Sequence, residues 1–596
     1  MSMYLGMTAL QEFWPENGKV WLLSRGCLPN LDASDCHGNW QIAGIVSDPF
    51  ESDGDAEFAY KEIWRIASEV IVWLSARLNA LHDVNHSERY WRTHIGFWVL
   101  LFVSVIYDRH AHLLKAKDEV PGITVIGIDA TQTITPIDTI DFVHQVTDDL
   151  YNQQIYTALA KKLGINISHH KLSGIVGGLE KRAAFKGKGL KRFLKTLGQL
   201  GYATFCSLFA RKADLLMVSS YLPRKFEIAL LLSSFGKIAP LYSLSTLKVP
   251  DSGPDEAMRS AFSVGSNAAS VPIESLTSAV LDLVAMCIPR AFVEDYTEIS
   301  RNSERVYGRY KPKGIYSASA WWFDEPFKHW AAQCQERGAI LIGAEHGSAA
   351  FIGKYKLTER MEIEISDFFV TWGWDSDVEP KIIPLPANKL INIRKRYTEK
   401  IGNGILYIAT AHARHNVGMV EDFSNYVDWQ TRFFQAVSCQ LTGEILVRLY
   451  QHDYGWKMKN RLEKISDQLR FDDWRIIFRK RLRDCRLCIF DYVSTTFAEA
   501  LASNVPAILF FNQEKYPINM QMASHFRALK DAKILHDSPE SAAAWASQVY
   551  ESPSTWWHSP ECQAAVRGFC EMYAYQHRAP LKEWKGRLEA LMDRQI

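Results

Sequence analysis

The feature that most constrains the fold of this chain is a strand–helix alternation that runs through its first part and then starts again. Short apolar runs such as Leu215–Ser219 and Phe368–Thr371 are typical of buried strands, and amphipathic segments such as Ala56–Leu81 are typical of helices. Strands separated by helices predict a mostly parallel sheet covered on both faces. The alternation restarts at Ile405–Ala409, after a charged, Pro-containing stretch, Pro380–Lys400, which we interpret as an interdomain linker.

The length of the chain sets the expected number of domains. At 596 residues it exceeds the roughly 250 to 300 residues that one hydrophobic core serves. We therefore predict an α/β protein with two Rossmann-like, doubly wound domains and helical insertions in its N-terminal half. The first domain is expected at 1–395, with a basic, helical insertion at about 150–212, and the second at 396–596, ending in helices. Ligands of such folds bind in the crevice at the carboxyl ends of the strands.

Charge and cysteine content exclude several classes of protein. A net charge of +1, with 47% hydrophobic and 23% charged residues, argues against a nucleic-acid binder, a disordered chain or a collagen-like chain. The 10 cysteines, scattered singly apart from Cys485 and Cys488, favour a reducing compartment over a disulfide scaffold. With no secretory signal at Met1–Leu10, the expected localisation is cytoplasmic. The longest apolar run, Ile95–Tyr107, is too short to span a bilayer and is predicted to be a buried helix.

One basic segment departs from this balance. Lys181–Lys195 holds seven basic residues and no acidic one, interleaved with Phe and Leu. A basic amphipathic helix of this kind can lie on an anionic membrane surface, which would make the protein peripheral on the inner face of the cytoplasmic membrane. The alternative is a solvated helix face in an insertion, because Gly187 and Gly189 each weaken a helix by roughly 1 kcal/mol.

The segment that begins at Asp491 carries the clearest indication of a ligand site. An apolar strand ends at Asp491, the hydroxyl residues Ser494, Thr495 and Thr496 form the turn, and a helix begins at once. Helix N-termini present unpaired N–H groups to anions, so Ser494, Thr495 and Thr496 are expected to hold the phosphate of a donor, and Asp491 is expected to take part in donor binding. Glu499, one turn later, could accept hydrogen bonds from ribose hydroxyls, although ordinary capping of the helix is an alternative.

A second strand tip carries Glu345, His346 and Gly347. The strand delivers Glu345 and His346 at its carboxyl end, and Gly347 lets the backbone turn sharply. An imidazole with an ordinary pKa suits general-base work, so His346 could take the proton from an acceptor hydroxyl. It could instead bind the donor phosphate, and a lone histidine at a strand end is more often structural.

Two further histidine-containing turns follow strands of the second half. Arg448 and His452 are expected to face the same crevice, where Arg448 could clamp a phosphate or could pair with Asp453 as scaffolding. His412 and His415 have a spacing that can bind metal, but no third ligand is near in sequence. We therefore expect no metal and no cofactor. Walker, G-x-G-x-x-G and G-x-S-x-G signatures are missing, which disfavours an ATPase, a dehydrogenase or a hydrolase.

Taken together, these segments resemble a known family: the transferases encoded in O-antigen and other surface-carbohydrate gene clusters of bacteria. The resemblance rests on Tyr90-Trp-Arg92 with Asp108-Arg109, Glu345-His-Gly347, Ser366–Trp374, Arg448-Leu-Tyr450 with Asp453–Trp456, Asp491-Tyr492 with Ser494–Thr496 and Glu499, and Trp556-Trp557. It implies a GT-B-like glycosyltransferase that takes a nucleotide-activated sugar and an oligosaccharide or lipid-linked acceptor. It also implies that Tyr90, Trp91, Arg92 and Asp108 shape the acceptor side, although Trp91 could simply be core.

The sequence departs from the family at one position, where Glu345 replaces the Gln that usually precedes His-Gly. A carboxylate beside His346 is expected to raise the pKa of the imidazole. That change could strengthen the base, or it could repel an anionic donor and leave an altered enzyme. Motifs of similar appearance also occur in transferases that use CMP-linked acidic sugars such as Kdo or sialic-acid relatives.

The leading functional hypothesis is therefore transfer of a sugar, such as one of these acidic sugars, from a nucleotide-activated donor to a surface-polysaccharide or lipid-linked acceptor. Two alternatives stay open. One is a polyol-phosphate-type phosphotransferase, which would form a phosphodiester. The other is a non-catalytic scaffold of polysaccharide assembly.

Overall fold

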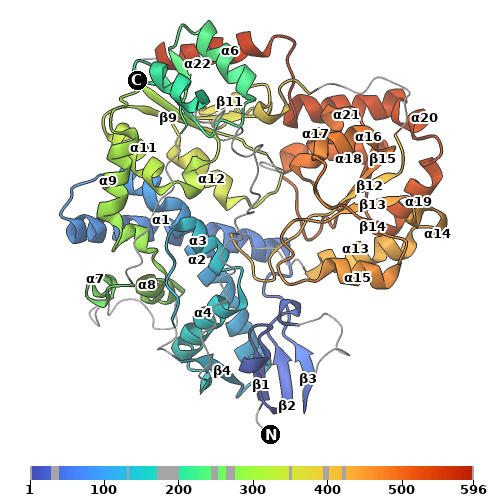
Figure 1. Ribbon diagram of the computed structural model, residues 1–596. Coiled ribbons are helices and arrows are strands. Elements are labelled where there is room, and N and C mark those ends of the chain that lie inside the picture. The colour runs from blue at the N-terminus through green and yellow to red at the C-terminus, as the bar shows by residue number, and fades with distance from the viewer. Residues whose placement is uncertain are drawn as a thin grey trace.

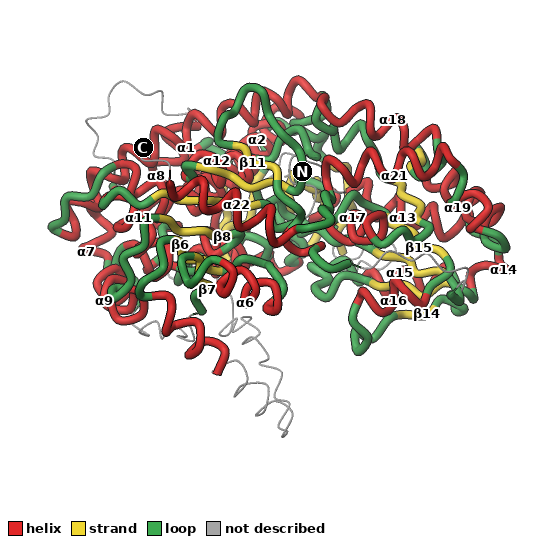
Figure 2. Tube along the Cα trace, turned by 90° about the horizontal axis from the view of Figure 1, so that it is seen from above, coloured by secondary structure: helices red, strands yellow, loops and turns green. Residues whose placement is uncertain are grey.

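The computed structural model describes residues 3–28, 39–129, 133–170, 201–242, 253–263, 276–347, 352–393, 402–418 and 424–593. Within them the chain forms three parallel sheets with helices packed around them (Figure 1). Seen from above, the third sheet and its helices lie on one side of the molecule, and the second sheet lies on the other (Figure 2). Figure 1 shows β1 to β4 of the first sheet below them, near the N-terminus. The predicted α/β class with doubly wound sheets is confirmed, and the first part of the chain holds two sheets.

The first sheet has the order β3-β2-β1-β4-β5, and all its strands are parallel. Its strands are β1 (Met3–Gly6), β2 (Asn17–Leu22), β3 (Asn39–Ile45), β4 (Thr124–Ile128) and β5 (Asn166–His170). Helices α1 (Asp53–His82) and α2 (Glu88–Glu119) connect β3 to β4, and α3 (Thr139–Gln145) and α4 (Asp149–Lys162) connect β4 to β5. The beginning of the expected insertion at about 150–212 is thus part of this sheet and its helices.

The second sheet has the order β11-β10-β9-β8-β6-β7 and is also parallel. Its strands are β6 (Leu215–Val218), β7 (Ile238–Pro240), β8 (Gly314–Ser317), β9 (Ile340–Ala344), β10 (Phe368–Thr371) and β11 (Ile382–Pro384). Its helices are α6 (Arg224–Ser233), α9 (Tyr296–Tyr307), α10 (Ala320–Phe323), α11 (Glu325–Glu336), α12 (Leu357–Ile365) and the C-terminal α22 (Pro580–Asp593), which packs on α6. Helices α7 (Glu256–Arg259) and α8 (Leu276–Cys287) come between β7 and β8 in sequence, but α8 packs on α2 and α4 of the first part of the chain. Strand β11 lies inside the predicted linker, so only the later part of Pro380–Lys400 can serve as one.

The third sheet has the order β14-β13-β12-β15-β16-β17, which is the 3-2-1-4-5-6 order of a Rossmann fold. Its strands are β12 (Ile405–Ile408), β13 (Ile445–Arg448), β14 (Arg470–Phe471), β15 (Leu487–Phe490), β16 (Ala507–Phe510) and β17 (Leu535–His536). Its helices are α13 (Ser424–Ala436), α14 (Cys439–Thr442), α15 (Met458–Ile465), α16 (Phe478–Asp484), α17 (Thr495–Ala502), α18 (Ala523–Asp531), α19 (Pro539–Val549), α20 (Pro553–Trp557) and α21 (Pro560–Tyr573). The strand order reverses between β12 and β15, and ligands of such folds bind at that point.

Helix α2 forms much of the core. Ser87 caps its first turn by accepting from the backbone N–H of Tyr90, and buried side chains occur all around its middle, as a fully enclosed helix requires. It is long and apolar enough to span a membrane, but 78% of its most apolar window is buried inside the protein. The prediction of a buried helix at Ile95–Tyr107 is confirmed. Lys181–Lys195 and the predicted domain boundary at 395 lie outside the described residues, so both stay predictions.

Candidate functional site

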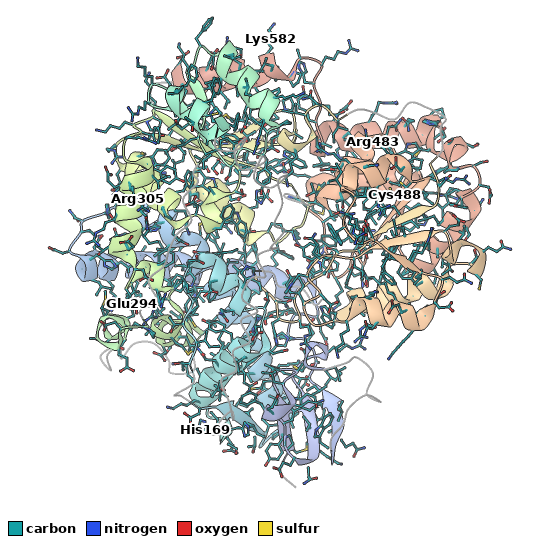
Figure 3. All side chains as sticks on the ribbon, in the orientation of Figure 1. His169, Glu294, Arg305, Arg483, Cys488 and Lys582 are labelled. Carbon is teal, nitrogen blue, oxygen red and sulfur yellow. The ribbon has the colours of Figure 1, made fainter. Side chains whose placement is uncertain are left out.

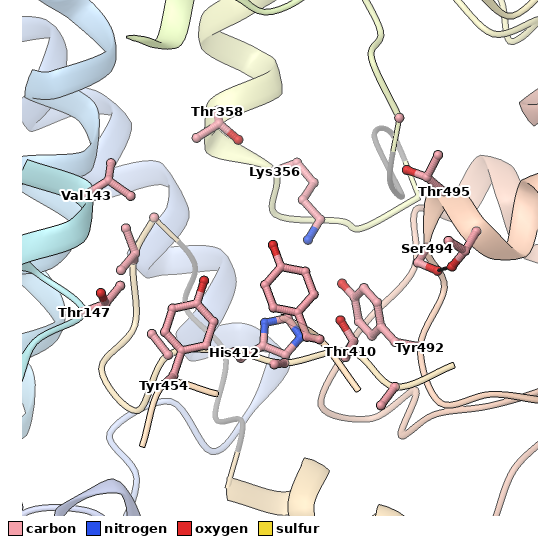
Figure 4. Close-up of a pocket in the computed structure, with 18 of the residues that line it drawn as sticks. Val143, Thr147, Lys356, Thr358, Thr410, His412, Tyr454, Tyr492, Ser494 and Thr495 are labelled. Atoms are coloured by element: carbon pink, nitrogen blue, oxygen red, sulfur yellow. Dashed lines mark hydrogen bonds between the residues drawn. The ribbon is translucent and has the colours of Figure 1, made fainter. Parts of the chain in front are cut away.

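A cavity of about 680 Å³ lies where the second and third sheets face each other (Figure 4). Its walls come from the loops that follow β9, β12, β13 and β15, from the start of α12, and from Leu101, Val143 and Thr147 of the first part of the chain. The volume is in the range of small-molecule sites in proteins. Six of the residues that the sequence predicts for the site line this cavity: His346, Arg448, Asp491, Ser494, Thr495 and Thr496.

The carboxyl ends of β12 and β15 are tied together by Asp491. Its buried carboxylate accepts from the hydroxyls of Tyr407 at 3.0 Å and Tyr426 at 2.6 Å, from the Thr410 backbone N–H at 2.9 Å, and from Gln430. Burial raises the pKa of Asp491 to about 6. Because these donors occupy its oxygens, Asp491 fixes the two strand ends at the reversal point, and we assign it a positioning role.

The N-terminus of α17 faces the cavity. Ser494 occupies the N-cap position with extended dihedral angles, but its hydroxyl makes no capping bond to the helix and instead bonds the Thr496 hydroxyl at 2.7 Å. The side chains of Ser494, Thr495 and Thr496 all line the cavity. A first helical turn without a side-chain cap, flanked by hydroxyls, suits an anion such as a phosphate.

Glu499 lies in the same helix but does not line the cavity. Its carboxylate faces Arg479 at 3.4 Å, and the Arg479 guanidinium also donates to the Lys389 backbone carbonyl at 2.6 Å. The capping role considered for Glu499 is not seen, because its side chain pairs with Arg479. These contacts join α16 and α17 of the third sheet to the segment after β11 of the second.

The two predicted strand tips meet at Gly347 and Thr495. Gly347 has a φ of +118°, a conformation that L side chains rarely adopt. A Cβ atom built on Gly347 would lie 2.6 Å from Thr495 Oγ1, so the backbone after His346 packs directly on the first turn of α17. The clusters around His346 and Ser494 therefore lie on one cavity, as predicted.

His346 is half-buried at the end of β9. Its ring stacks beside Tyr221 with centroids 6.0 Å apart, and its Nδ1 lies 3.7 Å from Glu362 Oε1. Burial, and then the charge of Lys389, lower the pKa of His346 to about 4. At neutral pH the imidazole is therefore uncharged, which is the form that a general base needs.

Glu345 does not act on His346, which corrects the expectation that it raises the pKa of the imidazole. Successive side chains of an extended segment point to opposite sides, and the Glu345 carboxyl is buried against Trp372 N at 2.8 Å and Trp374 Nε1 at 3.1 Å. Burial, and then the charge of Glu359, raise the pKa of Glu345 well above its usual value. A neutral carboxyl that faces away from the cavity neither strengthens the base nor repels a donor.

Arg448 lines the cavity, but its guanidinium is already paired with a carboxylate of the protein. It pairs with the buried Asp472, donates to the Ile476 carbonyl at 3.1 Å, and lies 3.8 Å from the ring centre of Trp474. The partner is thus Asp472 and not Asp453, whose carboxylate accepts from backbone N–H groups at the start of α15. His452 is exposed and does not line the cavity; its ring contacts Tyr454 with centroids 4.5 Å apart.

The three residues Tyr90, Trp91 and Arg92, assigned to the acceptor side, lie in the helical core, away from the cavity. The Tyr90 hydroxyl bonds His329 Nδ1 at 2.6 Å, and Trp91 Nε1 donates to Asn79 at 2.9 Å, both fully buried. Arg92 pairs with Glu88 one turn earlier, at 2.6 Å. Here the polar and aromatic pattern reflects helix packing, because α2 is enclosed by α1, α11 and α12.

Asp108, also assigned to the acceptor side, lines a second cavity of about 200 Å³. It is buried, pairs with Arg109 at 2.6 Å, and accepts from Asn416 at 3.0 Å. Asn416 belongs to the loop after β12, which also holds Arg414 and His415. That loop lines both cavities, so Asp108 joins the first part of the chain to a wall of the main one.

A forked contact holds the same loop a few residues away. Asp149, the first residue of α4, accepts from Arg414 at 2.6 Å and from His415 Nε2 at 2.8 Å. Burial opposes ionisation of Asp149, but the His415 hydrogen bond and the two neighbouring basic groups leave its pKa lowered. The Nε2 atom of His415 is thus hydrogen-bonded to Asp149. No group of three or more potential metal ligands occurs within the part of the chain that the structure describes.

Sequence reasoning missed three ionisable residues of the cavity wall, Lys356, Glu359 and Glu362. Figure 4 shows the Lys356 side chain extending into the cavity above His412 and Tyr492. Glu362 accepts from Trp322 Nε1, and burial raises the pKa of its carboxyl well above the usual value. No local motif marks these residues: Lys356 is the N-cap of α12, and Glu359 and Glu362 lie within that helix, whose sequence is that of an ordinary amphipathic helix.

The pair Cys485 and Cys488 belongs to the core. Both side chains are buried, and Figure 3 shows Cys488 within the third sheet.

Comparisons with known proteins place the chain in a family. No curated protein is significantly similar to it in sequence. Among solved structures, the MnaA–UDP complex from S. aureus is 10% identical, with a TM-score of 0.36 over 64% of this chain and 96% of that chain. The wall teichoic acid polymerase TagF is 10% identical, with a TM-score of 0.32 over 68% and 99%. UDP-GlcNAc 2-epimerase from Neisseria meningitidis is 11% identical, with a TM-score of 0.35 over 63% and 99%. The profile described as LIC12162 family transferase matches residues 3–588, so the chain belongs to this family of transferases.

Proposed function

We propose that this transferase moves a glycosyl group from a nucleotide-activated sugar to a hydroxyl of an oligosaccharide or lipid-linked acceptor. The observation that carries the proposal is the meeting of two chemically different strand tips in one cavity. An uncharged imidazole, His346, stands beside an uncapped helix N-terminus, at Thr495. Direct displacement of the leaving group by an acceptor hydroxyl uses these two functions together: a base for the attacking hydroxyl and a binding site for the departing phosphate.

Each part of the cavity has a role in this proposal. His346 takes the proton from the acceptor hydroxyl, and Ser494, Thr495 and Thr496 with the first turn of α17 hold the leaving phosphate. Lys356 supplies positive charge on the opposite wall. The rings of three tyrosines can stack on a nucleobase or a sugar: Tyr450, Tyr454 and Tyr492.

The finer parts of the proposal are the sugar, the acceptor and the place of action. An acidic sugar such as Kdo or a sialic-acid relative is supported by Lys356, because an ammonium group would pair with the carboxylate of such a sugar. We further propose that the protein acts in the cytoplasm, on surface-polysaccharide intermediates, without a metal or cofactor.

Nucleotide binding is the first test. Purified protein is heated with CMP-, UDP-, GDP- and dTDP-linked sugars, and a ligand at about 100 times its Kd should stabilise the protein by roughly 2.7 kcal/mol. Product analysis by mass spectrometry then separates the candidate reactions. A glycosidic bond supports the proposal, and a phosphodiester supports a phosphotransferase. If no nucleotide sugar stabilises the protein, a non-catalytic scaffold is favoured.

Two variants test the roles within the cavity. His346→Ala should reduce kcat by roughly 10²- to 10⁴-fold and leave nucleotide binding nearly unchanged, because general-base catalysis contributes in that range. Lys356→Ala should weaken nucleotide-sugar binding by roughly tenfold or more, since charged hydrogen bonds contribute about 1.5 to 3 kcal/mol. Lys354→Ala is the matched control, because Lys354 lies outside the cavity and pairs with Asp53 at 2.7 Å. Full turnover in His346→Ala would remove the base assignment.

A further inference from the structure

Three large apolar side chains at one end of the second sheet are exposed to solvent. Phe235 is 93% exposed, Leu208 is 71% exposed and Leu232 is 59% exposed. Leu208 belongs to the apolar helix Gly201–Ala210, and the other two lie in or just after α6. We call these three residues the apolar tip. Grouped exposed apolar residues are uncommon on a soluble protein and mark surfaces that bind a partner or a membrane.

Contacts between the two helices bring the apolar tip together. At one end, the Tyr202 hydroxyl donates to Glu227 of α6 at 2.8 Å. At the other end, a Cβ on Gly236 would lie 3.3 Å from the Phe209 ring. Helix Gly201–Ala210 therefore runs beside α6 in the same direction, and Leu208 lies at the same end of the pair as Phe235. Figure 1 shows α6 at the outer edge of the molecule, beside α22.

The apolar tip is flanked by positive charge. Arg211, Lys212 and Lys237 are exposed and directly follow the two helices. Lys585 of α22 lies 6.0 Å from the ring centre of Phe235 and pairs with Glu589 at 3.9 Å. No acidic residue occurs in 204–213 or 228–237.

We propose that the apolar tip docks on an anionic membrane surface, with Phe235, Leu208 and Leu232 among the lipid headgroups. An apolar centre with a cationic border matches the apolar interior and anionic headgroups of such a surface, and each basic residue near it adds attraction. A protein partner would have to present an apolar hollow surrounded by acidic residues. That is a more specific requirement than an anionic lipid surface.

The apolar tip and the residues beside the cavity lie at opposite ends of α6. Tyr221, which stacks beside His346, immediately precedes the turn into α6, and Phe235 follows the end of that helix. The 10 residues of α6 span about 15 Å, so Tyr221 and Phe235 lie roughly one helix length apart. That geometry suits an acceptor carried on a lipid, a point that rests on the proposed function.

Vesicle co-sedimentation of the full chain tests the proposal without donor or acceptor, so its outcome is independent of sugar transfer. Vesicles of phosphatidylcholine mixed with phosphatidylglycerol are compared with pure phosphatidylcholine. The protein should bind the anionic vesicles, and added salt should weaken that binding. The double variant Leu208→Ser with Phe235→Ser should bind at least roughly tenfold more weakly. It lacks two large apolar side chains whose transfer from water into the lipid would favour binding.

A matched control separates the apolar tip from general hydrophobicity. Val378 is 87% exposed and Met520 is 80% exposed, and both lie outside the tip, so Val378→Ser with Met520→Ser should bind vesicles as the wild type does. The proposal is overturned if the wild type does not bind anionic vesicles, or if the two double variants bind them with the same affinity. It is also overturned if size-exclusion chromatography shows a wild-type dimer that Phe235→Ser dissociates, since the tip would then join two copies of the chain.

Discussion

Replacing Gly347 with alanine probes the contact on which the proposed active site depends. The substitution adds one methyl group where the end of β9 meets α17. Two costs follow from the geometry. The φ of +118° is strained for any L side chain, at about 1 to 3 kcal/mol. The new methyl would also lie 2.6 Å from Thr495 Oγ1 and 3.1 Å from Thr495 Cγ2, where ordinary contacts begin at 3.4 Å.

The chain supplies a matched control for the first cost. Gly18 in β2 has a φ of +119°, and a Cβ there would meet nothing within 4 Å. Gly18→Ala should therefore cost only the backbone term, about 1 to 3 kcal/mol. Gly347→Ala should cost a further 1 to 3 kcal/mol or so from overpacking. Thr495→Ala removes both close atoms, so the Gly347→Ala and Thr495→Ala double variant should recover most of the overpacking cost.

Urea unfolding and nucleotide affinity are measured for the four variants in parallel. Gly347→Ala should be less stable than Gly18→Ala and should also lose nucleotide affinity, since it displaces the first turn of α17. Gly18→Ala should keep that affinity. Equal effects of the two glycine substitutions, with no recovery from Thr495→Ala, would refute the reasoning that the two strand tips are in contact.

Three further predictions concern buried ionisable side chains. Glu345→Gln should keep activity and change stability by less than about 1 kcal/mol, because the neutral carboxyl only accepts hydrogen bonds there; thermal unfolding and turnover test this, and a large loss would contradict it. Arg448→Ala should destabilise the protein by about 3 kcal/mol by leaving the fully buried Asp472 with fewer partners, and an unchanged Tm would count against it. Because His346 must be uncharged to accept a proton and its pKa is about 4, kcat/KM should persist down to that pH and fall below it; an acidic limb near 6.5 would mean that another group is the base.

The position of the site was predictable because its signals are local. A buried strand, a short polar turn and a helix start form one continuous pattern at Asp491–Thr495, and a similar pattern ends at His346. In a parallel sheet such strand ends gather at one edge, so the sequence alone could bring them together. The first sheet was harder to separate, because β2 begins with three exposed residues and lacks a continuous apolar run.

The roles of individual polar residues were less predictable, because they depend on partners far away in sequence. Arg448 is neutralised by Asp472, 24 residues later, and Tyr90 bonds His329, 239 residues later. The wall residue Lys356 follows no motif. Sequence spacing locates a strand end, but it does not say which of two adjacent side chains, such as Glu345 and His346, turns inward.

The forked contact of Asp149 also limits how the molecule can open. Arg414 and His415 belong to the loop between the two cavities, and Asp149, the first residue of α4, accepts hydrogen bonds from both. A hinge motion that swung the third sheet away would have to break both hydrogen bonds to the Asp149 carboxylate, at about 1.5 to 3 kcal/mol each. Substrate exchange by local rearrangement of the cavity rim avoids that cost. We therefore expect the contact between α4 and the loop after β12 to keep the second and third sheets at a nearly constant separation.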